Sequence, residues 1–373
     1  MIGLISTSLS DISFVGKLSN HFYENNIPFK LLLSGQHSYD ENLSKRASSL
    51  LKINKKYIFR YSTNKNKNDL NKIYLDTSSS TNDALKFVEE NHIKNILISG
   101  DRYEMLIAAI PLSQIGCNLI HYGAGQISKG SKDDLYRKCI SIICNYHLVS
   151  TAKSKENLIK QKIFNVSNIS ITGSIGLDRV YEFSKKNKVL VQEGKVLIAL
   201  HPEVKNNQKI INLVFDSLIY AEKIFQQKLH IVLSLPNNDY QSEKALKSIQ
   251  EFIKLKEYSY EILSATSDQY FLESLKSSQI IIGNSSSFVI EAPSLNKVSI
   301  IIGSRQEGRE SAQSVIHTFY DNKKLLAAID IAHKENHPNN IKKDDDLYLN
   351  PYWQGGSCNN IVSSLKKWNL LTK

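Results

Sequence analysis

Short apolar runs alternate along this chain with segments whose apolar residues recur at helical spacing. The runs Leu31-Leu32-Leu33 and Ile96-Leu97-Ile98 are continuous, which is typical of strands buried on both faces of a parallel sheet. In the first half the pattern predicts strands at Ile2–Ser6, Lys30–Leu33, Asn95–Ser99, Asn118–His121 and Tyr146–Ser150, and helices at Ser13–Asn25, Thr81–Asn91, Tyr103–Ile115 and Lys132–Ile143. This alternation predicts a doubly wound α/β sheet.

The pattern pauses around Gly173–Val189, where Lys185–Lys188 is polar enough for a linker, and then restarts. The second half predicts strands at Lys195–Leu200, His230–Leu235, Tyr258–Leu263, Ile280–Ile282 and Ser299–Ile302, and helices at Lys209–Gln226, Ser242–Lys254, Gln269–Leu275 and Phe288–Leu295. We therefore expect two Rossmann-like domains facing each other across a cleft. The expected bounds are 1–175, joined by a C-terminal helix over 358–373, and 176–357.

Composition narrows the class of protein. The 373 residues include 41% hydrophobic and 22% charged residues, which is ordinary for a globular chain. The net charge of +11 would suit a polyanion, but the lysines are dispersed and no nucleic-acid motif is present, so we expect no nucleic-acid partner. The four cysteines match no zinc spacing, and no metal site is expected. Without a long apolar run or a signal-like N-terminus, we expect a cytoplasmic protein with no membrane partner.

Candidate chemistry in the second half follows two predicted strands. After Ile280–Ile282 the chain reads Gly283, Asn284 and three serines, Ser285, Ser286 and Ser287, and then a helical segment. Backbone N–H groups and hydroxyls at such a turn bind phosphate, although a plain serine-rich N-cap fits equally well. Glu291, one to two turns later, is placed to accept ribose hydroxyls. Arg305 and Arg309 follow the next strand and suit an anion clamp, with surface arginines as the alternative.

In the first half, Asp101 and Arg102 follow the predicted strand Asn95–Ser99. Asp101 suits an acid/base role, although an aspartate N-cap explains it as well. Asp133, Asp134 and Arg137 stand at a predicted helix start, where paired acids are often only partners of the helix dipole. His201, directly after another strand, is a candidate acid/base group or phosphate donor, with a structural histidine as the alternative.

Together these segments resemble the UDP-N-acetylglucosamine 2-epimerases. The resemblance rests on Gly100-Asp-Arg-Tyr-Glu104, His121 through Arg137, Ala199-Leu-His-Pro202, Ile282-Gly-Asn-Ser-Ser-Ser287 and Glu291-Ala-Pro293. The block Gly303-Ser-Arg-Gln-Glu-Gly-Arg-Glu310 is similar to the hydrolysing branch, which serves sialic-acid and legionaminic-acid synthesis. The matches run in the family's order over nearly the whole chain. The resemblance implies a GT-B fold, a UDP-sugar substrate, no cofactor and a homodimer.

The family's residues carry over position by position. The resemblance implies that Ser285, Ser286, Ser287 and Arg305 hold the diphosphate and Glu291 the ribose. Further nucleotide contacts would come from Ser13, Arg102 and Asn237. Catalytic carboxylates would be Asp101 and Asp133, supported by His201 and Arg137. Family members of this kind remove the C2 proton and expel UDP to give a glycal, and water then adds to release UDP and a manno-configured amino sugar.

Four positions depart from the family pattern. The arginine after the first strand is Leu9 here, and a basic residue of some members is Phe14. The first catalytic glutamate or histidine is Gly123, and a later glutamate is Gln126. Glycine and leucine cannot transfer protons. The sequence therefore leaves three hypotheses open: a hydrolysing 2-epimerase, a nucleotide-sugar-binding homologue without turnover, or altered chemistry such as glycosyl transfer.

Overall fold

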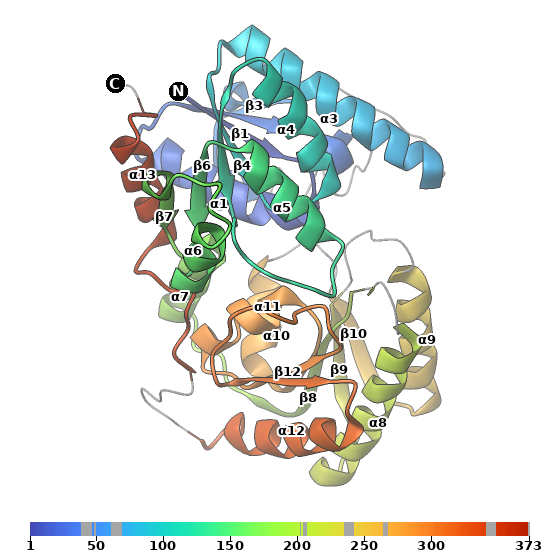
Figure 1. Cartoon of the computed structure of the whole chain (residues 1–373). Coiled ribbons are helices and arrows are strands. Elements are labelled where there is room, and N and C mark those ends of the chain that lie inside the picture. The colour runs from blue at the N-terminus through green and yellow to red at the C-terminus, as the bar shows by residue number, and fades with distance from the viewer. Residues whose placement is uncertain are drawn as a thin grey trace. The chain divides into compact units, whose positions relative to one another are not determined.

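A computed structural model describes residues 1–38, 47, 50–60, 69–201, 203, 207–234, 242–263, 268–340 and 348–371 (Figure 1). The chain forms two compact units. Unit 1 comprises residues 1–126, 133–178 and 352–373, and unit 2 comprises residues 127–132 and 179–351. The short segment 127–132 belongs to unit 2, where the Lys129 N–H donates to the Glu307 carbonyl at 3.1 Å.

Unit 1 is built on a seven-stranded sheet with the order β3-β2-β1-β4-β5-β6-β7. All of its strand pairs are parallel, with Leu4 opposite Leu31 and Leu97 opposite Ile120, for example. The strands are β1 (Ile2–Ser6), β2 (Phe29–Leu33), β3 (Ile58–Phe59), β4 (Asn95–Ser99), β5 (Asn118–Tyr122), β6 (Tyr146–Val149) and β7 (Ile169–Ile171). The continuous apolar runs of the sequence are the central strands, as expected for strands covered on both faces.

Helices cover both faces of this sheet, so unit 1 has two large apolar cores. One core joins α1 and α13 to alternate strand residues such as Leu4 and Leu31, and the other joins α3, α4 and α5 to Ile5 and Ile98. The helices are α1 (Leu9–Glu24), α3 (Asp69–Asn91), α4 (Tyr103–Gln114), α5 (Asp133–Ile143), α6 (Ala152–Ile159) and α13 (Ser357–Lys367). Short 3-10 turns are η1 (Gly35–Ser38), η2 (Lys55–Tyr57) and η3 (Val166–Asn168).

Unit 2 repeats the plan with a six-stranded parallel sheet in the order β10-β9-β8-β11-β12-β13. Its strands are β8 (Gln192–Ala199), β9 (His230–Ser234), β10 (Ser259–Leu263), β11 (Ser278–Gly283), β12 (Ser299–Ile302) and β13 (Val315–Phe319). Its helices are α8 (Asn207–Phe225), α9 (Ser242–Leu255), α10 (Asp268–Ser277), α11 (Ser286–Ile290), α12 (Asn322–Glu335) and the 3-10 turn η4 (Pro293–Leu295). The largest core of this unit packs α8, α9 and α12 against one face of the sheet.

Helix α7 (Ile175–Lys186) contains the boundary between the units, after Asp178. The Asp178 carboxylate accepts the N–H groups of Ser357 and Cys358, at 2.7 and 2.8 Å, and so caps α13. Close by, the Ser174 N–H donates to the Tyr352 carbonyl at 3.0 Å. These bonds fix the C-terminal helix to unit 1, because they satisfy N–H groups that a helix start leaves without internal partners.

The predicted α/β class and two parallel sheets are confirmed, and the predicted elements match the observed ones to within a few residues at most ends. Two local interpretations were wrong. The pause at Gly173–Val189 contains helix α7, and the expected linker at Lys185–Lys188 includes the last turn of that helix. Helix α3 begins at Asp69, well before the start of the predicted helix Thr81–Asn91. In α7 a polar exposed helix face hid the helical period, because the polar side chains dominate the pattern.

Candidate functional site

The guanidinium of Arg137 is the centre of a polar cluster at the carboxyl ends of the unit 1 strands. It forms an ion pair with Asp101, which follows β4. The same guanidinium donates to Asp134 at 3.1 Å and to the Gln126 carbonyl at 3.2 Å. The Arg137 side chain is 4% exposed, whereas that of Asp101 is 30% exposed. Asp101 is therefore an accessible carboxylate that is oriented by a buried cation, which keeps it a candidate for the acid/base role.

Asp133 and Asp134 differ in their surroundings although they are neighbours. Asp134 is buried and pairs with Arg137 and with Lys138, whose Nζ lies 2.7 Å from Asp134 Oδ2. Asp133, the first residue of α5, is partly exposed. The structure thus brings the predicted Asp101 and Arg137 together, adds Asp134 as a structural partner, and leaves Asp133 the more accessible of the pair.

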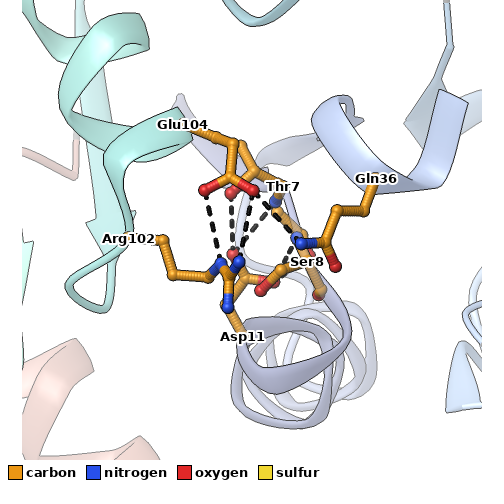
Figure 2. Close-up of polar contacts among 7 residues, drawn as sticks. Thr7, Ser8, Asp11, Gln36, Arg102 and Glu104 are labelled. Atoms are coloured by element: carbon orange, nitrogen blue, oxygen red, sulfur yellow. Dashed lines mark hydrogen bonds and ion pairs between the residues drawn. The ribbon is translucent and has the colours of Figure 1, made fainter. Parts of the chain in front are cut away.

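A second buried cluster joins the loops that follow β1, β2 and β4 (Figure 2). The Glu104 side chain is fully buried and accepts from Gln36 Nε2 at 3.1 Å and from Arg102 Nε at 3.3 Å. Asp11 accepts the N–H groups of Thr7 and Ser8 at 3.0 and 2.9 Å. Figure 2 shows these side chains converging from three segments that are far apart in the sequence.

Burial, hydrogen bonds and a neighbouring charge all affect the Asp11 carboxyl group in this cluster. Burial raises the pKa of Asp11, while hydrogen bonds from Thr7, Ser6 and Ser8 and the charge of Arg102 lower it. The guanidinium of Arg102, 14% exposed, serves two carboxylates, because it pairs with Glu104 and stabilises Asp11. Asp11 caps α1 through its capping box with Ser8, so it acts structurally. Arg102, expected to contact a nucleotide, has protein partners that fix its position within unit 1.

The positions that depart from the family pattern lie in unit 1, in helix α1 and in the loop after β5. Phe14, partly exposed on α1, places its ring 6.3 Å from the ring of Tyr122, so an aromatic contact occupies a position that is basic in some relatives. Position 9 lies in the first turn of α1, and Ser13, partly exposed, follows one turn later. Gln126 donates from its amide to the Ser150 hydroxyl at 3.0 Å.

Gly100 and Gly123 end the adjacent strands β4 and β5 in the same unusual conformation. Both have a φ of +90°, and a Cβ built on either would meet no described atom within 4 Å. Space therefore does not require glycine at either position, but the backbone conformation does, since L-residues rarely adopt it. The loop after β5 is thus shaped around the absence of a side chain at Gly123.

His121, on β5, is structural. Its Nε2 lies 2.9 Å from the Gly100 carbonyl and its Nδ1 lies 2.9 Å from the Ser141 hydroxyl. A carbonyl only accepts, so Nε2 carries the proton and Nδ1 accepts from the hydroxyl. Burial lowers the pKa of His121 to about 3, against the opposing effect of the Gly100 hydrogen bond. The ring is therefore neutral at physiological pH and supports the loop that bears Asp101.

In unit 2, Asn284 ties together the loops that follow β8 and β11. Its side chain accepts from the His201 N–H at 2.7 Å and donates to the His201 carbonyl at 2.8 Å. The side-chain amide thus bonds both backbone groups of His201, as the backbone of a neighbouring strand would. Its own carbonyl accepts from Arg305 Nη1 at 3.3 Å and from Gln306 Nε2 at 2.9 Å. This close approach requires glycine at 283, where a Cβ would lie 2.0 Å from the Ala199 carbonyl oxygen. Asn284 thus aims Arg305 at the serine-rich turn.

The serine-rich turn begins the short helix α11. Ser285 is its N-cap and accepts from the Ser287 N–H at 3.4 Å, while Ser286 and Ser287 are partly exposed. With five residues, α11 has a smaller dipole than the longer helix expected over Phe288–Leu295. The hydroxyls, the turn's N–H groups and the Arg305 charge are therefore the main means by which this turn can bind an anion. Glu291, at the C-cap of α11, pairs with Arg179 at 2.8 Å.

Glu203 is a residue that the sequence analysis missed. Its carboxylate accepts the N–H groups of Ser304 and Arg305 at 2.8 and 2.9 Å and the Tyr320 hydroxyl at 2.5 Å. It therefore fixes the loop that carries Arg305. An acidic residue two positions after His201 was the available signal. His201 itself is partly exposed beside Asn284, and Asn237, expected to contact the nucleotide, lies outside the described residues.

Within the described part of the chain, no group of three or more His, Cys, Asp or Glu side chains is arranged to bind a metal ion. Over the same residues, no helix combines the length and the apolar character needed to cross a bilayer. All four cysteines are free thiols, and Cys117, Cys144 and Cys358 are buried.

The buried neutral state of His121 makes stability depend on pH. Because its folded pKa lies below that of the unfolded chain, the unfolded state gains a proton first as the pH falls below about 6.5, and stability is lost from there down to about pH 3. The contribution is on the order of 2 kcal/mol at about pH 5. His121→Gln retains both hydrogen-bonding groups without the titration. Urea unfolding at about pH 7.5 and about pH 5 should show a smaller pH-dependent loss for the variant. An identical loss in both proteins would contradict the assignment.

Comparison with known proteins identifies the family. The sequence matches the family model described as UDP-N-acetylglucosamine 2-epimerase over residues 21–366. It is 30% identical over 283 residues to the UDP-N,N'-diacetylbacillosamine 2-epimerase (hydrolyzing) of Legionella pneumophila, which covers 73% of this chain and 70% of that protein. It is 29% identical over 289 residues, 75% of this chain and 71% of the relative, to a polysialic acid biosynthesis protein of Escherichia coli.

Solved structures share the fold. UDP-GlcNAc 2-epimerase from Neisseria meningitidis, solved with UDP-GlcNAc, matches with a TM-score of 0.79 at 18% identity over 98% of this chain and 99% of that one. The enzyme from Methanocaldococcus jannaschii, solved with UDP-GlcNAc and UDP, matches with a TM-score of 0.76 at 20% identity over the same shares. The architecture is therefore that of the GT-B fold. The chain belongs to the UDP-N-acetylglucosamine 2-epimerase family, and its relatives place it with the hydrolysing branch.

Proposed function

We propose that this protein is a hydrolysing 2-epimerase of a UDP-linked 2-acetamido sugar, with UDP and a manno-configured amino sugar as products. The observation that carries the proposal is the accessible Asp101 carboxylate, oriented by the buried Arg137 at the end of β4. Membership of the family and the hydrolysing names of its relatives support the same reaction.

The proposed nucleotide contacts gather in unit 2. Ser285, Ser286, Ser287 and Arg305 would bind the diphosphate, and Glu291 would accept ribose hydroxyls. Expulsion of UDP develops negative charge on the diphosphate, and a fixed guanidinium with nearby hydroxyl and N–H donors stabilises that charge. Ser13, Arg102 and Asn237 would make the remaining nucleotide contacts.

The proposed chemistry requires two proton transfers. A carboxylate, Asp101, removes the C2 proton, and the electron pair expels UDP from C1 to give a glycal. Water then adds across that double bond, with its hydroxyl at C1 and a proton returned to C2 on the opposite face. Asp133 is the second carboxylate, and His201 and Arg137 support the two steps. Paired carboxylates can perform this chemistry without a metal or redox cofactor.

Further aspects of the proposal concern context. We expect the protein to act in the cytoplasm as a homodimer, in the synthesis of nonulosonic acids such as legionaminic acid for capsule or other surface polysaccharides. The named role of the Escherichia coli relative in polysialic acid biosynthesis supports this direction.

One observation favours two other functions. Glycine at position 123 and glutamine at position 126 remove two ionisable side chains from the proposed sugar side, while the residues expected to bind the diphosphate, Ser285, Ser286, Ser287 and Arg305, are all present. A binding protein without turnover, or a glycosyl transferase on the same fold, would have this combination.

Isotope incorporation separates the three functions. The purified protein is incubated in D2O with UDP-GlcNAc and analogues substituted on the sugar, and UDP release and C2 deuterium are followed. Free UDP together with a C2-deuterated mannosamine derivative is the expected result, because C2 loses its proton to the enzyme and regains one from solvent. Tight UDP binding without turnover indicates the binding protein. UDP release that requires an acceptor indicates glycosyl transfer.

Asp101→Asn tests the proposed base. Asparagine keeps the size of the side chain but cannot take a proton, so we expect kcat to fall by roughly 10²–10⁴-fold while UDP affinity is retained. Asp134→Asn is the matched control, since Asp134 pairs with the same guanidinium but is buried. An equal loss of turnover in both variants would show that the two carboxylates only position Arg137.

Gly123→Glu tests the missing carboxylate. No described atom lies within 4 Å of a Cβ at this position, but its φ of +90° makes any side chain costly, by roughly 1–2 kcal/mol. Gly123→Gln carries the same strain without the charge, so the difference between the two variants isolates the carboxylate. Faster UDP release by Gly123→Glu than by Gly123→Gln shows that a lost group limits the reaction. Equal or slower release shows that the loop has been rebuilt around glycine.

A further inference from the structure

The carboxylate of Glu291 has a cationic partner that no family motif in the sequence indicated. Arg179 Nη2 lies 2.8 Å from Glu291 Oε1, and the two side chains are 22% and 6% exposed. Arg179, on α7, is the first residue of the second segment of unit 2, 179–351, and it follows Asp178, which is bonded to α13. The pair therefore holds a nearly buried carboxylate close to the start of this segment.

The backbone around Glu291 is held as well. Asn350 Nδ2 donates to the Ile290 carbonyl and to the Ser294 hydroxyl, both at 2.7 Å. The Glu291 N–H donates to the Ser287 carbonyl at 2.8 Å. Residues on both sides of Glu291 are thus fixed by bonds from outside the segment, and Arg179 supplies the contact that fixes the carboxylate itself.

We infer that Arg179 is a positioning residue for recognition of the ribose diol of a nucleoside diphosphate. It acts through Glu291, and the inference rests on the proposed nucleotide site. A carboxylate that has lost its water needs a partner charge to remain ionised. The Arg179 contact supplies that charge through Oε1. A carboxylate has about four acceptor sites, and the contact with Arg179 through Oε1 does not use all of them.

This role predicts a loss that depends on the hydroxyls of the ligand. Arg179→Gln removes the positive charge and the contact that orient this carboxylate, so the carboxylate accepts the ribose hydroxyls less well. The diphosphate contacts at Ser285, Ser286 and Arg305 are unaffected, because none of them involves α7. Only ligands that carry the diol should therefore bind more weakly.

Calorimetric titration with UDP and with 2′,3′-dideoxy-UDP measures this dependence. For Arg179→Gln we expect UDP binding to weaken about tenfold, as for loss of a charge-assisted hydrogen bond, with the affinity for dideoxy-UDP unchanged. Arg179→Lys keeps the charge and should restore most of the UDP affinity. Glu291→Gln should discriminate in the same way, and the double variant should lose no more than either single variant.

The controls separate positioning from folding. Lys186→Gln removes a charge from the exposed end of the same helix and should leave both affinities unchanged. Equal weakening of UDP and dideoxy-UDP by Arg179→Gln, with a lower melting temperature, would mean a purely structural ion pair and would overturn the inference. If Arg179→Gln does not fold, the ratio of the two affinities in Glu291→Gln decides in the same way. A wild-type protein that binds neither ligand would instead overturn the proposed function.

Discussion

Burial of the Arg137 guanidinium is the constraint on which the proposed catalytic half of the molecule depends. A buried charge is tolerated only where fixed acceptors replace water, and here they are Asp101, Asp134 and the Gln126 carbonyl. These acceptors come from the loop after β4, from α5 and from the loop after β5. One cation therefore joins three separate segments, and the orientation of Asp101 follows from this requirement. The buried His121 supports the same edge through its bonds to Gly100 and Ser141.

In unit 2, fixed loops hold the hydrogen-bond donors of the proposed anion site. Asn284 and Glu203 satisfy backbone groups in the loops after β8, β11 and β12, so these loops have fixed shapes. Arg305 is held by both, through its side chain at Asn284 and through its N–H at Glu203. Donors held in this way do not need to reorganise when a charged group binds, which is the physical basis of electrostatic stabilisation.

The periodic pattern was sufficient to predict the two parallel sheets, because short continuous apolar runs that alternate with helical segments are typical of strands covered on both faces. It was insufficient for α7, where exposed polar residues mask the helix, and for Glu203 and Arg179, whose partners lie far along the chain. Such pairings depend on tertiary packing, which no local window contains. The resemblance to a family supplied Glu291, whereas only the structure supplied the arginine that holds it. All the assigned roles of site residues, those of Asp101, Arg305 and Glu291 included, stay predictions.

The two substitutions on the sugar side, Gly123 and Gln126, have a common electrostatic meaning. Asp101 and Asp134 pair with Arg137, and Asp134 also pairs with Lys138, so a glutamate at 123 or 126 would add further negative charge at this end of the unit 1 sheet. When several carboxylates lie close together, the negative charge of each one disfavours the ionised form of the others. Without such a glutamate, Asp101 has fewer acidic neighbours that compete for Arg137. In the reaction proposed above, the same change removes a candidate proton donor for C2, so the two proton transfers at C2 rest on Asp101 and Asp133.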